Sequence, residues 1–357
     1  MVKAPVVLAA PHRLLFLVGS VQFALVVTWW GAMLLDLVGM GPDLEQPIPA
    51  SLLHAPILLF LVLPALFLGF LLTVFPRWTG FPDSAPAIYV PVGVAFLLAL
   101  FGFGAKAGLL PLHVWLPEAH PAAPSPVSAL MSGVMLNTAI YGMLRVSFDL
   151  LQLQLWWWGA LLLALGLATA LFGVVFAAVQ TDMKRLLAYS SIENMGLLFV
   201  GMGLALIFFG HGMRPMAALA LTATLYHVAS HAFFKSLLFL GTGSVLHATS
   251  ERSLGKLGGL IRTMPWVGWL TLLGVLASAG LPPLGGFVSE WLLLQSFLFT
   301  PGLPVPLLTM LIPVVAALIA LVAALAGYTM VKFFGVIFLG QPREEKLAHA
   351  HDAGRYE

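Results

Sequence analysis

An apolar run between Thr224 and Leu240 carries three ionisable side chains at a regular helical spacing. His227, His231 and Lys235 recur every four residues, so on an α-helix they share one face, each about 6 Å further along the axis. A protonatable group at the centre of a bilayer costs about 2.5–3.5 kcal/mol on insertion scales, so it normally faces a bundle interior or water. We refer to these three residues as the ladder. Their spacing predicts a buried polar face on a membrane helix.

Two interpretations fit the ladder. Histidine exchanges protons near neutral pH, and a lysine held out of water gives up its proton more readily, so three such groups on one face suggest a proton path. In the alternative, the histidines hydrogen-bond neighbouring helices and Lys235 extends its ammonium to a membrane interface.

The composition places the whole chain in a membrane. Only 8% of the 357 residues are charged and 61% are hydrophobic, and the mean hydropathy is +1.02. These values exclude an ordinary water-soluble domain and predict an all-α, polytopic transmembrane helix bundle in a lipid bilayer. The net charge of +2, without a dense basic run, argues against nucleic acid as a partner. The absence of cysteine excludes disulfides, thiolate metal sites and iron–sulfur ligation.

Apolar segments predict about nine membrane spans. One span holds the ladder, and the other eight cover residues 14–39, 52–76, 88–112, 126–147, 155–179, 192–209, 265–299 and 306–338. Residues 1–10 lack the features of a removed signal peptide, so the first span is expected to be its own insertion signal. Asp182, Lys184 and Arg185 predict a membrane-surface helix leading into 192–209, with Glu193 interpreted as a solvated boundary residue.

A Pro/Gly-rich connection at residues 77–87 separates the first two spans from the others. The predicted domains are a two-span segment, 1–85, a membrane domain, 86–342, and a polar tail, 343–357. In the tail, His349 and His351 are too sparse to predict a metal site.

Two spans of the membrane domain are interrupted beside a charge. Lys106 lies five residues before Pro111, and Glu290 follows Pro282, Pro283 and two glycines. Helix breaks at membrane depth are tolerated where they are buried in protein or line a cavity. The pair predicts two discontinuous helices and a partial inverted repeat, with a partial first repeat at 86–150 and a second at 151–340. Alternatively, Lys106 reaches an interface near a helix end, and 265–299 forms two short crossings.

Basic residues between the spans predict the orientation of the chain. If the loops beside the ladder are cytoplasmic, eight basic residues lie inside: Lys184, Arg185, Arg252, Lys256, Arg262, Arg343, Lys346 and Arg355. Five then lie outside: Lys3, Arg13, Arg77, Arg145 and Arg214. The bias follows the positive-inside rule, although Lys3 and Arg13 point the other way for the first two spans.

Residues from about 90 to 342 resemble the antiporter-like, proton-conducting membrane subunits of complex I and related hydrogenases. The resemblance rests on KAGLLPLHVWLPEAHPAAPSPVSALMSG, TDMKRLLAYSSIENMG, HVASHAFFKSLLFLGTGSVLHAT and AGLPPLGGFVSEWLL. The spellings ENMG, GFVSEW and VKFFGVIFLGQPR are most similar to the branch of formate hydrogenlyase and hydrogenase-4.

The resemblance implies roles for individual residues. Lys106 matches the lysine of the first broken helix, the ladder matches the central relay, and Glu290 matches the acid of the second broken helix. Lys332 is then a peripheral member of the same hydrated axis. Asn137 stands where quinone-reductase members usually place a lysine, and an amide carries no proton charge, so that step has to use water.

The front of the chain departs from this family. Members normally have about six more helices before the Lys106 helix, including one whose glutamate pairs with that lysine. Residues 1–85 match none of these, so Lys106 is expected to be neutral or paired by another subunit. About the first 80 residues instead resemble NnrS-type haem-copper membrane proteins, through PHRLLFLVGS and LLHAPILLFLVLPALFLGFLLTVFPRW. That resemblance implies His12 and His54 as candidate metal or haem ligands, although histidines at span edges are more often simply hydrogen-bonded or hydrated.

Three functions follow from these observations. The first is a proton-translocating membrane subunit of a hydrogenase or complex I-like oxidoreductase in a prokaryotic inner membrane. Its redox cofactors are expected in partner subunits, with no cofactor and no catalytic centre in this chain. The second is a haem- or copper-binding membrane protein organised by residues 1–85. The third is a non-conducting structural remnant of the antiporter-like fold.

Overall fold

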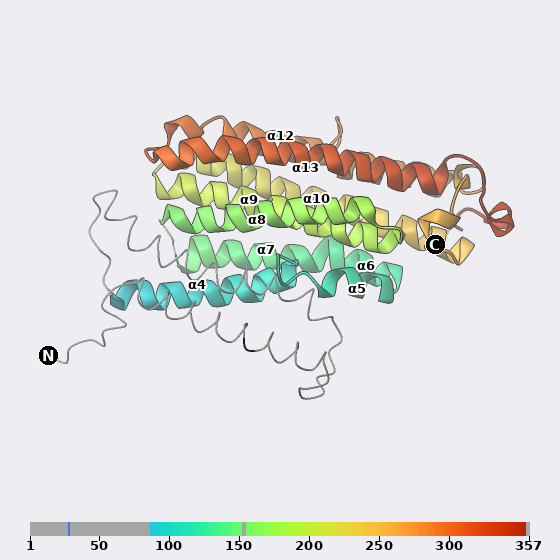
Figure 1. Cartoon of the computed structure of the whole chain (residues 1–357), viewed down its shortest axis with the longest axis horizontal. Coiled ribbons are helices and arrows are strands. Elements are labelled where there is room, and N and C mark those ends of the chain that lie inside the picture. Colours follow the sequence, from blue (N-terminus) through green and yellow to red (C-terminus); the bar gives the residue numbers. More distant parts are fainter. Residues whose placement is uncertain (1–27, 29–85, 152–154, 355–357) are drawn as a thin grey trace. The chain divides into compact units, whose positions relative to one another are not determined.

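The computed structural model describes Thr28, residues 86–151 and residues 155–354 of the chain (Figure 1). Two compact units divide at residues 99 and 100, inside helix α4 (Pro86–Ala107). The predicted spans 14–39 and 52–76, with His12 and His54, lie outside the described residues. The domain boundary at 85 and the roles of those two histidines therefore stay predictions.

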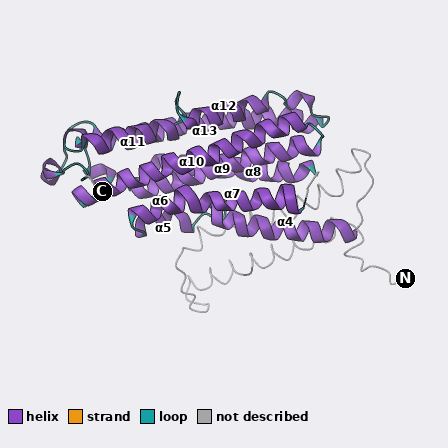
Figure 2. Cartoon of the chain, turned by 180° about the vertical axis from the view of Figure 1, so that it is seen from behind, coloured by secondary structure: helices purple, strands orange, loops and turns teal. Residues whose placement is uncertain are grey.

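The second unit consists of helices and their connections (Figure 2). They are α5 (Trp115–Ala122), α6 (Ser125–Leu130), α7 (Leu136–Leu144), α8 (Trp156–Val179), α9 (Met183–Gly210), α10 (Arg214–Thr249), α11 (Pro265–Ser278), α12 (Gly285–Phe297) and α13 (Pro306–Phe338). The π-helical segment Met131–Met135 joins α6 to α7, and a second, Arg145–Leu150, continues α7. Within the described ranges there is no β-strand, which confirms the predicted all-α class.

Five helices of the described part are long and apolar enough to cross a membrane. They are Ser125–Leu150, Trp156–Val179, Met183–Gly210, Arg214–Thr249 and Pro306–Phe338. They confirm five of the predicted spans. The predicted span 265–299 divides into α11 and α12, so the total of nine spans stays a prediction.

Helix α9 corrects one detail of the sequence analysis. Residues 183–210 form one continuous helix rather than a surface helix followed by a span at 192. The carboxylate of Asp182 accepts hydrogen bonds from the backbone N–H groups of Lys184 and Arg185, so the helix begins at that point. Lys184 does not require a surface position, because its ammonium donates to the carbonyl oxygen of Ala123 and the side chain is buried.

Helix α10, which carries the ladder, lies at the centre of the second unit. It packs against α6, α9, α11 and α12, and Figure 1 shows α8, α9, α10 and α13 running alongside one another. One apolar cluster packs around residues 197–208 of α9 and 217–223 of α10, and a second around residues 183–187 of α9 and 238–245 of α10. The buried polar residues of the stretches 190–194 in α9 and 224–235 in α10 lie in the layer between these clusters.

Helices α8 and α9 approach closely along a row of glycines. A Cβ atom at Gly166 would lie 2.7 Å from the carbonyl oxygen of Gly196, and one at Gly203 would lie 2.6 Å from that of Gly159. Only glycine permits such backbone proximity, as is common between membrane helices. The row continues to Gly173, which faces the backbone of Glu193.

The described basic residues that were predicted to face inside lie at one end of the second unit, and Arg355 lies outside the described residues. Arg185 pairs with Glu118 at 2.6 Å, and Arg252 pairs with Asp182 at 3.0 Å. Glu251 lies 3.6 Å from the ammonium of Lys256 and 3.2 Å from that of Lys346, and Arg343 donates to the carbonyl oxygen of Leu254. The tail predicted as a polar extension is therefore folded against the loop that follows α10, with Leu347 buried.

Candidate functional site

The first helix break follows Lys106 and its backbone groups are satisfied locally. Gly108 has a φ of +76°, and the N–H of Leu110 donates to the hydroxyl of Thr169 at 3.2 Å. The indole N–H of Trp115 donates to the carbonyl oxygen of Ala105 at 2.8 Å. These bonds fulfil the requirement that non-helical backbone among membrane helices be paired within the protein.

The second break lies between α11 and α12, as the prolines predict. Gly280 has a φ of +63°, and the chain re-enters a helix at Gly285. Gly286 packs on the carbonyl oxygen of Ala277, where a Cβ atom would overlap that oxygen. The break places Ser289 and Glu290 in the first turns of α12, facing α10.

The ladder residues share the buried side of α10, as predicted. His227 is 5% exposed, and His231 and Lys235 are fully buried, whereas Phe233 on another side of the helix is 79% exposed. The imidazole centroids of the two histidines are 6.5 Å apart. The helical spacing therefore correctly predicted a shared interior face.

His227 is held by hydrogen-bonding groups from two neighbouring helices. Its Nε2 lies 3.1 Å from Oδ1 of Asn194 on α9, and its Nδ1 lies 2.8 Å from the hydroxyl oxygen of Ser289 on α12. The hydroxyl of Ser289 also lies 2.8 Å from the carbonyl oxygen of Gly286, which it donates to when it accepts from His227. Rotation of this single hydroxyl therefore suits either the neutral or the doubly protonated imidazole.

The position of Lys235 contradicts the alternative in which its ammonium reaches a membrane interface. Its Nζ donates to the hydroxyl oxygen of Ser190 at 2.7 Å and is enclosed in the bundle. The position of His231 also contradicts that alternative, because neither ring nitrogen has a hydrogen-bond partner among the described residues. Its ring instead packs edge-on against Phe234 at 5.4 Å. Of the two histidines, only His227 makes the interhelical hydrogen bonds expected under that alternative.

Glu193 is a site residue that the sequence analysis misjudged. It is 2% exposed, because α9 begins ten residues before it rather than at residue 192. Its Oε2 accepts a hydrogen bond of 3.2 Å from the hydroxyl of Ser190, which also binds Lys235. Asn194, one position further on, donates to the carbonyl oxygen of Ser190 at 2.7 Å. Residues 190–194, SSIEN, thus link Lys235 to His227. Their cluster of polar residues within an apolar span was the sequence signal that could have indicated a buried site.

A small cavity joins the ladder to the second break. Its volume is about 10 Å³, and it is lined by Thr224, His227, Ser289, Glu290 and five apolar or glycine residues. A cavity of this size corresponds to about one water molecule. Glu290 is half-buried, so the predicted acid lies next to the ladder at the second break.

Asn137 reaches the same interior from α7. Its amide nitrogen donates to the carbonyl oxygens of Gly133 at 2.8 Å and Val228 at 3.2 Å. Its Oδ1 is buried, with no hydrogen-bond partner in the described ranges. Val228 adjoins the ladder residue His227 in α10. The structure therefore brings Asn137 to the ladder helix, while its role in a proton path stays a prediction.

Two predicted lysines lie apart from this cluster. Lys106, at the end of α4, is exposed, with no hydrogen bond or ion pair to any residue that the structure describes. Lys332 donates to the carbonyl oxygens of Ala178 at 2.7 Å and Gln180 at 2.9 Å, at the C-terminal end of α8. That position suits an ammonium, because unpaired carbonyls and the helix dipole converge there.

His120 in α5 is a second buried group that sequence reasoning missed. It is fully buried, its ring stacks on Phe239 at 4.6 Å, and neither ring nitrogen has a hydrogen-bond partner in the part of the chain that the structure describes. Burial, followed by the positive charges of Lys235 and Lys184, lowers the pKa of His120 to about 4. The ring is therefore neutral at neutral pH.

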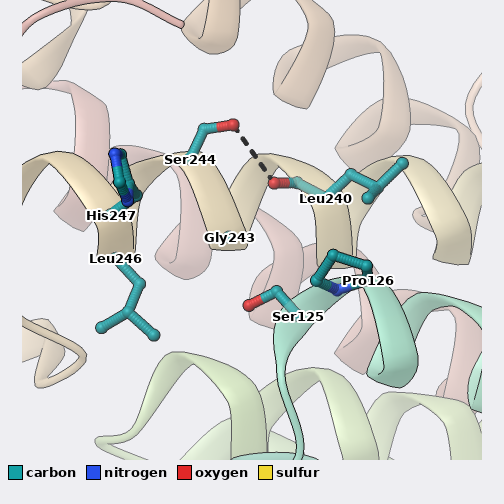
Figure 3. Close-up of a pocket in the computed structure, with 7 residues that line it drawn as sticks. All are labelled: Ser125, Pro126, Leu240, Gly243, Ser244, Leu246 and His247. Carbon is teal, nitrogen blue, oxygen red and sulfur yellow. Dashed lines mark hydrogen bonds between the residues drawn. The ribbon is translucent and has the colours of Figure 1, made fainter. Parts of the chain in front are cut away.

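A larger hollow lies beside the basic end, between the start of α6 and the second half of α10 (Figure 3). Its volume is about 490 Å³, and Ser125, Pro126, Leu240 and Ser244 are among its lining residues. Ser244 donates to the carbonyl oxygen of Leu240 at 3.4 Å. Among the described residues, no group of three or more His, Cys, Asp or Glu side chains is arranged to hold a metal ion.

Comparisons with known proteins show the family of this chain. The family described as "NADH:quinone oxidoreductase/Mrp antiporter, TM" matches residues 85–319. Hydrogenase-4 component B of Escherichia coli (strain K12) is 43% identical over 261 residues, which are 72% of this chain and 38% of that protein. Formate hydrogenlyase subunit 3 of the same organism is 40% identical over 255 residues, 71% of this chain and 42% of that protein. The chain thus spans about two fifths of the length of these curated relatives.

Two solved structures share the fold. A chain of the Mrp complex from Dietzia sp. DQ12-45-1b has a TM-score of 0.62 and 28% identity, covering 70% of this chain and 43% of that chain. A chain of the membrane-bound sulfane sulfur reductase, an archaeal respiratory membrane complex, has a TM-score of 0.62 and 25% identity. The match covers 99% of this chain and 50% of that chain. With five long apolar helices in its described part, this chain is a multi-pass membrane protein that belongs to the NADH:quinone oxidoreductase/Mrp antiporter family.

Proposed function

We propose that this chain is a proton-translocating membrane subunit of a hydrogenase or complex I-like assembly. The proposed path contains Lys106, Asn137, His227, His231, Lys235, Glu290 and, at its edge, Lys332. The observation that carries the proposal is the polar layer between two apolar clusters, which holds the ladder, with His227 and Glu290 lining the same small cavity. Ionisable groups inside a membrane bundle are costly to maintain, and in general they mark ion pathways.

Transfer along the ladder requires groups that both accept and donate protons. His227 meets this requirement, because rotation of the Ser289 hydroxyl accommodates either protonation state of the ring. The unpartnered nitrogens of His231 and the unpartnered Oδ1 of Asn137 are positions where water completes the path. One water in the small cavity would connect His227 to Glu290.

The proposed partners are other membrane subunits of such an assembly. Relatives with 40% and 43% identity carry the names of formate hydrogenlyase and hydrogenase-4 components. Redox cofactors would lie in the partners, which supply the driving force, and this chain would have no catalytic centre of its own. The basic end, with Arg185 and Arg252, is assigned to the cytoplasmic side of a prokaryotic inner membrane by the positive-inside rule.

Lys106 supports a competing proposal, a non-conducting structural remnant. An exposed ammonium without a partner among the described residues does not form the first half of a path by itself. In the conducting proposal, a partner subunit supplies the anion that Lys106 does not find among the described residues. The two proposals differ in whether a proton flux exists.

The deciding experiment measures proton flux across proteoliposomes that contain the assembled membrane complex. Lys235→Ala and Glu290→Gln are expected to reduce the flux to background, whereas Lys256→Ala, on an exposed lysine at the basic end, is expected to retain it. Loss of flux in all three variants would indicate a folding defect. A parent complex without flux would overturn the proposal in favour of the structural remnant.

A further inference from the structure

Glu193 is a buried acid that the ladder does not include. A Cβ atom at Gly173 of α8 would lie 2.8 Å from the Cα of Glu193, so the glycine lets α9 approach closely at this residue. The side chain is held among buried groups, 2% exposed, between the two apolar clusters. Such a position requires a compensating partner, because an unpaired carboxylate in a bundle interior is costly.

That partner is Lys235, reached through one hydroxyl. Lys235 donates to the oxygen of Ser190 at 2.7 Å, and the hydroxyl of Ser190 donates to Oε2 of Glu193 at 3.2 Å. Ser190 and Lys235 are fully buried. A hydroxyl group accepts one hydrogen bond while donating another, so it joins an acid and an amine as a proton relay.

No other described acid is placed to act on Lys235 in this way. The charges that act on Glu193 are those of Lys235, on α10, and Glu290, on α12. The remaining described acids lie on the short helix α5, at helix ends or in the loops and tail: Glu118, Asp149, Asp182, Glu251, Glu344, Glu345 and Asp352. Glu290 faces the cavity beside His227, which leaves Glu193 as the acid of the Lys235 end.

We propose that Glu193 exchanges a proton with Lys235 through the hydroxyl of Ser190, an inference that deepens and depends on the proposed proton path. The ammonium of Lys235 gives one proton to the oxygen of Ser190, while the hydroxyl proton of Ser190 moves to Oε2 of Glu193. The products are a neutral amine, an unchanged serine hydroxyl and a neutral carboxylic acid. Because the total charge of the three groups stays constant, the buried site holds the proton in either position, and the reverse step restores the ion pair.

The first test compares proton flux in the assembled complex. Glu193→Gln keeps the size of the side chain and removes its proton exchange, so flux is expected to fall to the level of Glu290→Gln. Glu193→Asp is expected to restore part of it. Ser190→Ala removes the relay and is expected to reduce flux, whereas Ser190→Thr keeps a hydroxyl and is expected to retain more of it. The matched control is Glu345→Gln in the exposed tail, with parental flux expected.

The second test does not depend on transport. Infrared difference spectra between two pH values are expected to contain a carboxyl stretching band that is absent in Glu193→Gln and present in Glu345→Gln. The band is expected to shift in frequency in Ser190→Ala, because the carboxyl group loses its hydroxyl donor. A merely structural role for Glu193 would produce no such band.

The outcomes separate this inference from the proposed function. If Lys235→Ala and Glu290→Gln abolish flux while Glu193→Gln conducts like the parent, the inference is wrong and the proposed function survives. If the parent conducts no protons, the proposed function is wrong. If, in addition, Glu193→Gln leaves the infrared spectrum unchanged, the proposed proton exchange is also wrong. A band that shifts in Ser190→Ala would then retain the exchange as a property of the buried site.

Discussion

The two broken helices contain similar sequence elements and have different surroundings. Both breaks contain a glycine with positive φ, Gly108 and Gly280, and a proline within three residues after it. Lys106 lies before the first break and is exposed, whereas Glu290 lies after the second and lines a cavity beside His227. A break thus frees the backbone, but neighbouring helices decide whether the adjacent charge is enclosed.

The difference shows what completes a membrane ion site. Around the second break, α9, α10 and α12 supply hydrogen-bonding side chains to one another. Around the first, Thr169 and Trp115 satisfy backbone groups while the ammonium of Lys106 has no described partner. We therefore propose that another subunit completes the site at the first break, by supplying an anion to Lys106.

Chemical labelling gives the largest expected contrast. A membrane-permeant amine reagent is expected to modify Lys106 about tenfold or more faster than Lys235 in the isolated chain, because Lys235 reacts only after local opening of the bundle. Mass spectrometry of the labelled peptides gives both rates, and unfolded protein is the reference for intrinsic reactivity. Assembly into the complex is expected to protect Lys106. Persistent labelling there would argue against a partner anion.

Glycine substitutions test how closely each break is packed. Gly286→Ala places a Cβ atom on the carbonyl oxygen of Ala277, so it is expected to lower the free energy of unfolding by about 1–3 kcal/mol. Gly102→Ala, near the first break, has no atom within 4 Å of the new Cβ and is expected to stabilise the helix by about 0.5–1 kcal/mol. Thermal unfolding in detergent measures both. Equal midpoints would mean that the second break is not tightly packed.

Lys332 tests whether a lysine outside the cluster has mainly a structural role. Lys332→Met removes the donor to the carbonyl oxygens of Ala178 and Gln180, at an expected cost of about 1–3 kcal/mol. The control is Lys256→Met, in an exposed pair 3.6 Å from Glu251, with an expected cost of about 0–1 kcal/mol. A Lys332→Met variant with parental stability and no proton flux would instead place this lysine within the path.

The smallest expected effect concerns the entry into α11, the helix before the second break. Asp352 accepts hydrogen bonds from the N–H groups of Trp266 at 2.7 Å and Val267 at 3.1 Å. Asp352→Ala is expected to cost about 1 kcal/mol and to speed hydrogen exchange at these two amides. Glu345→Ala, elsewhere in the tail, should leave their exchange unchanged, and equal rates in the two variants would show that the tail does not cap α11.

Much of the second unit was predictable because its signals are periodic. The spacing of His227, His231 and Lys235 predicted their shared buried face, and the prolines before Glu290 predicted the break between α11 and α12. Glu193 was misjudged, because a charged residue eight positions after Arg185 resembles a boundary residue when the membrane span is placed to begin at 192. Asp182 was the available signal for that start, since its carboxylate caps the helix.

The amino-acid sequence alone determined the membrane class of this protein, the long apolar helices and the positions of the breaks, because hydropathy, helical period and proline act over short stretches of chain. The tertiary structure decided which polar groups meet. Ser190 joins Glu193 to Lys235, and Ser289 reaches His227 across 62 positions of sequence. Such contacts depend on how closely helices pack and on their rotation about their axes, which no single segment specifies.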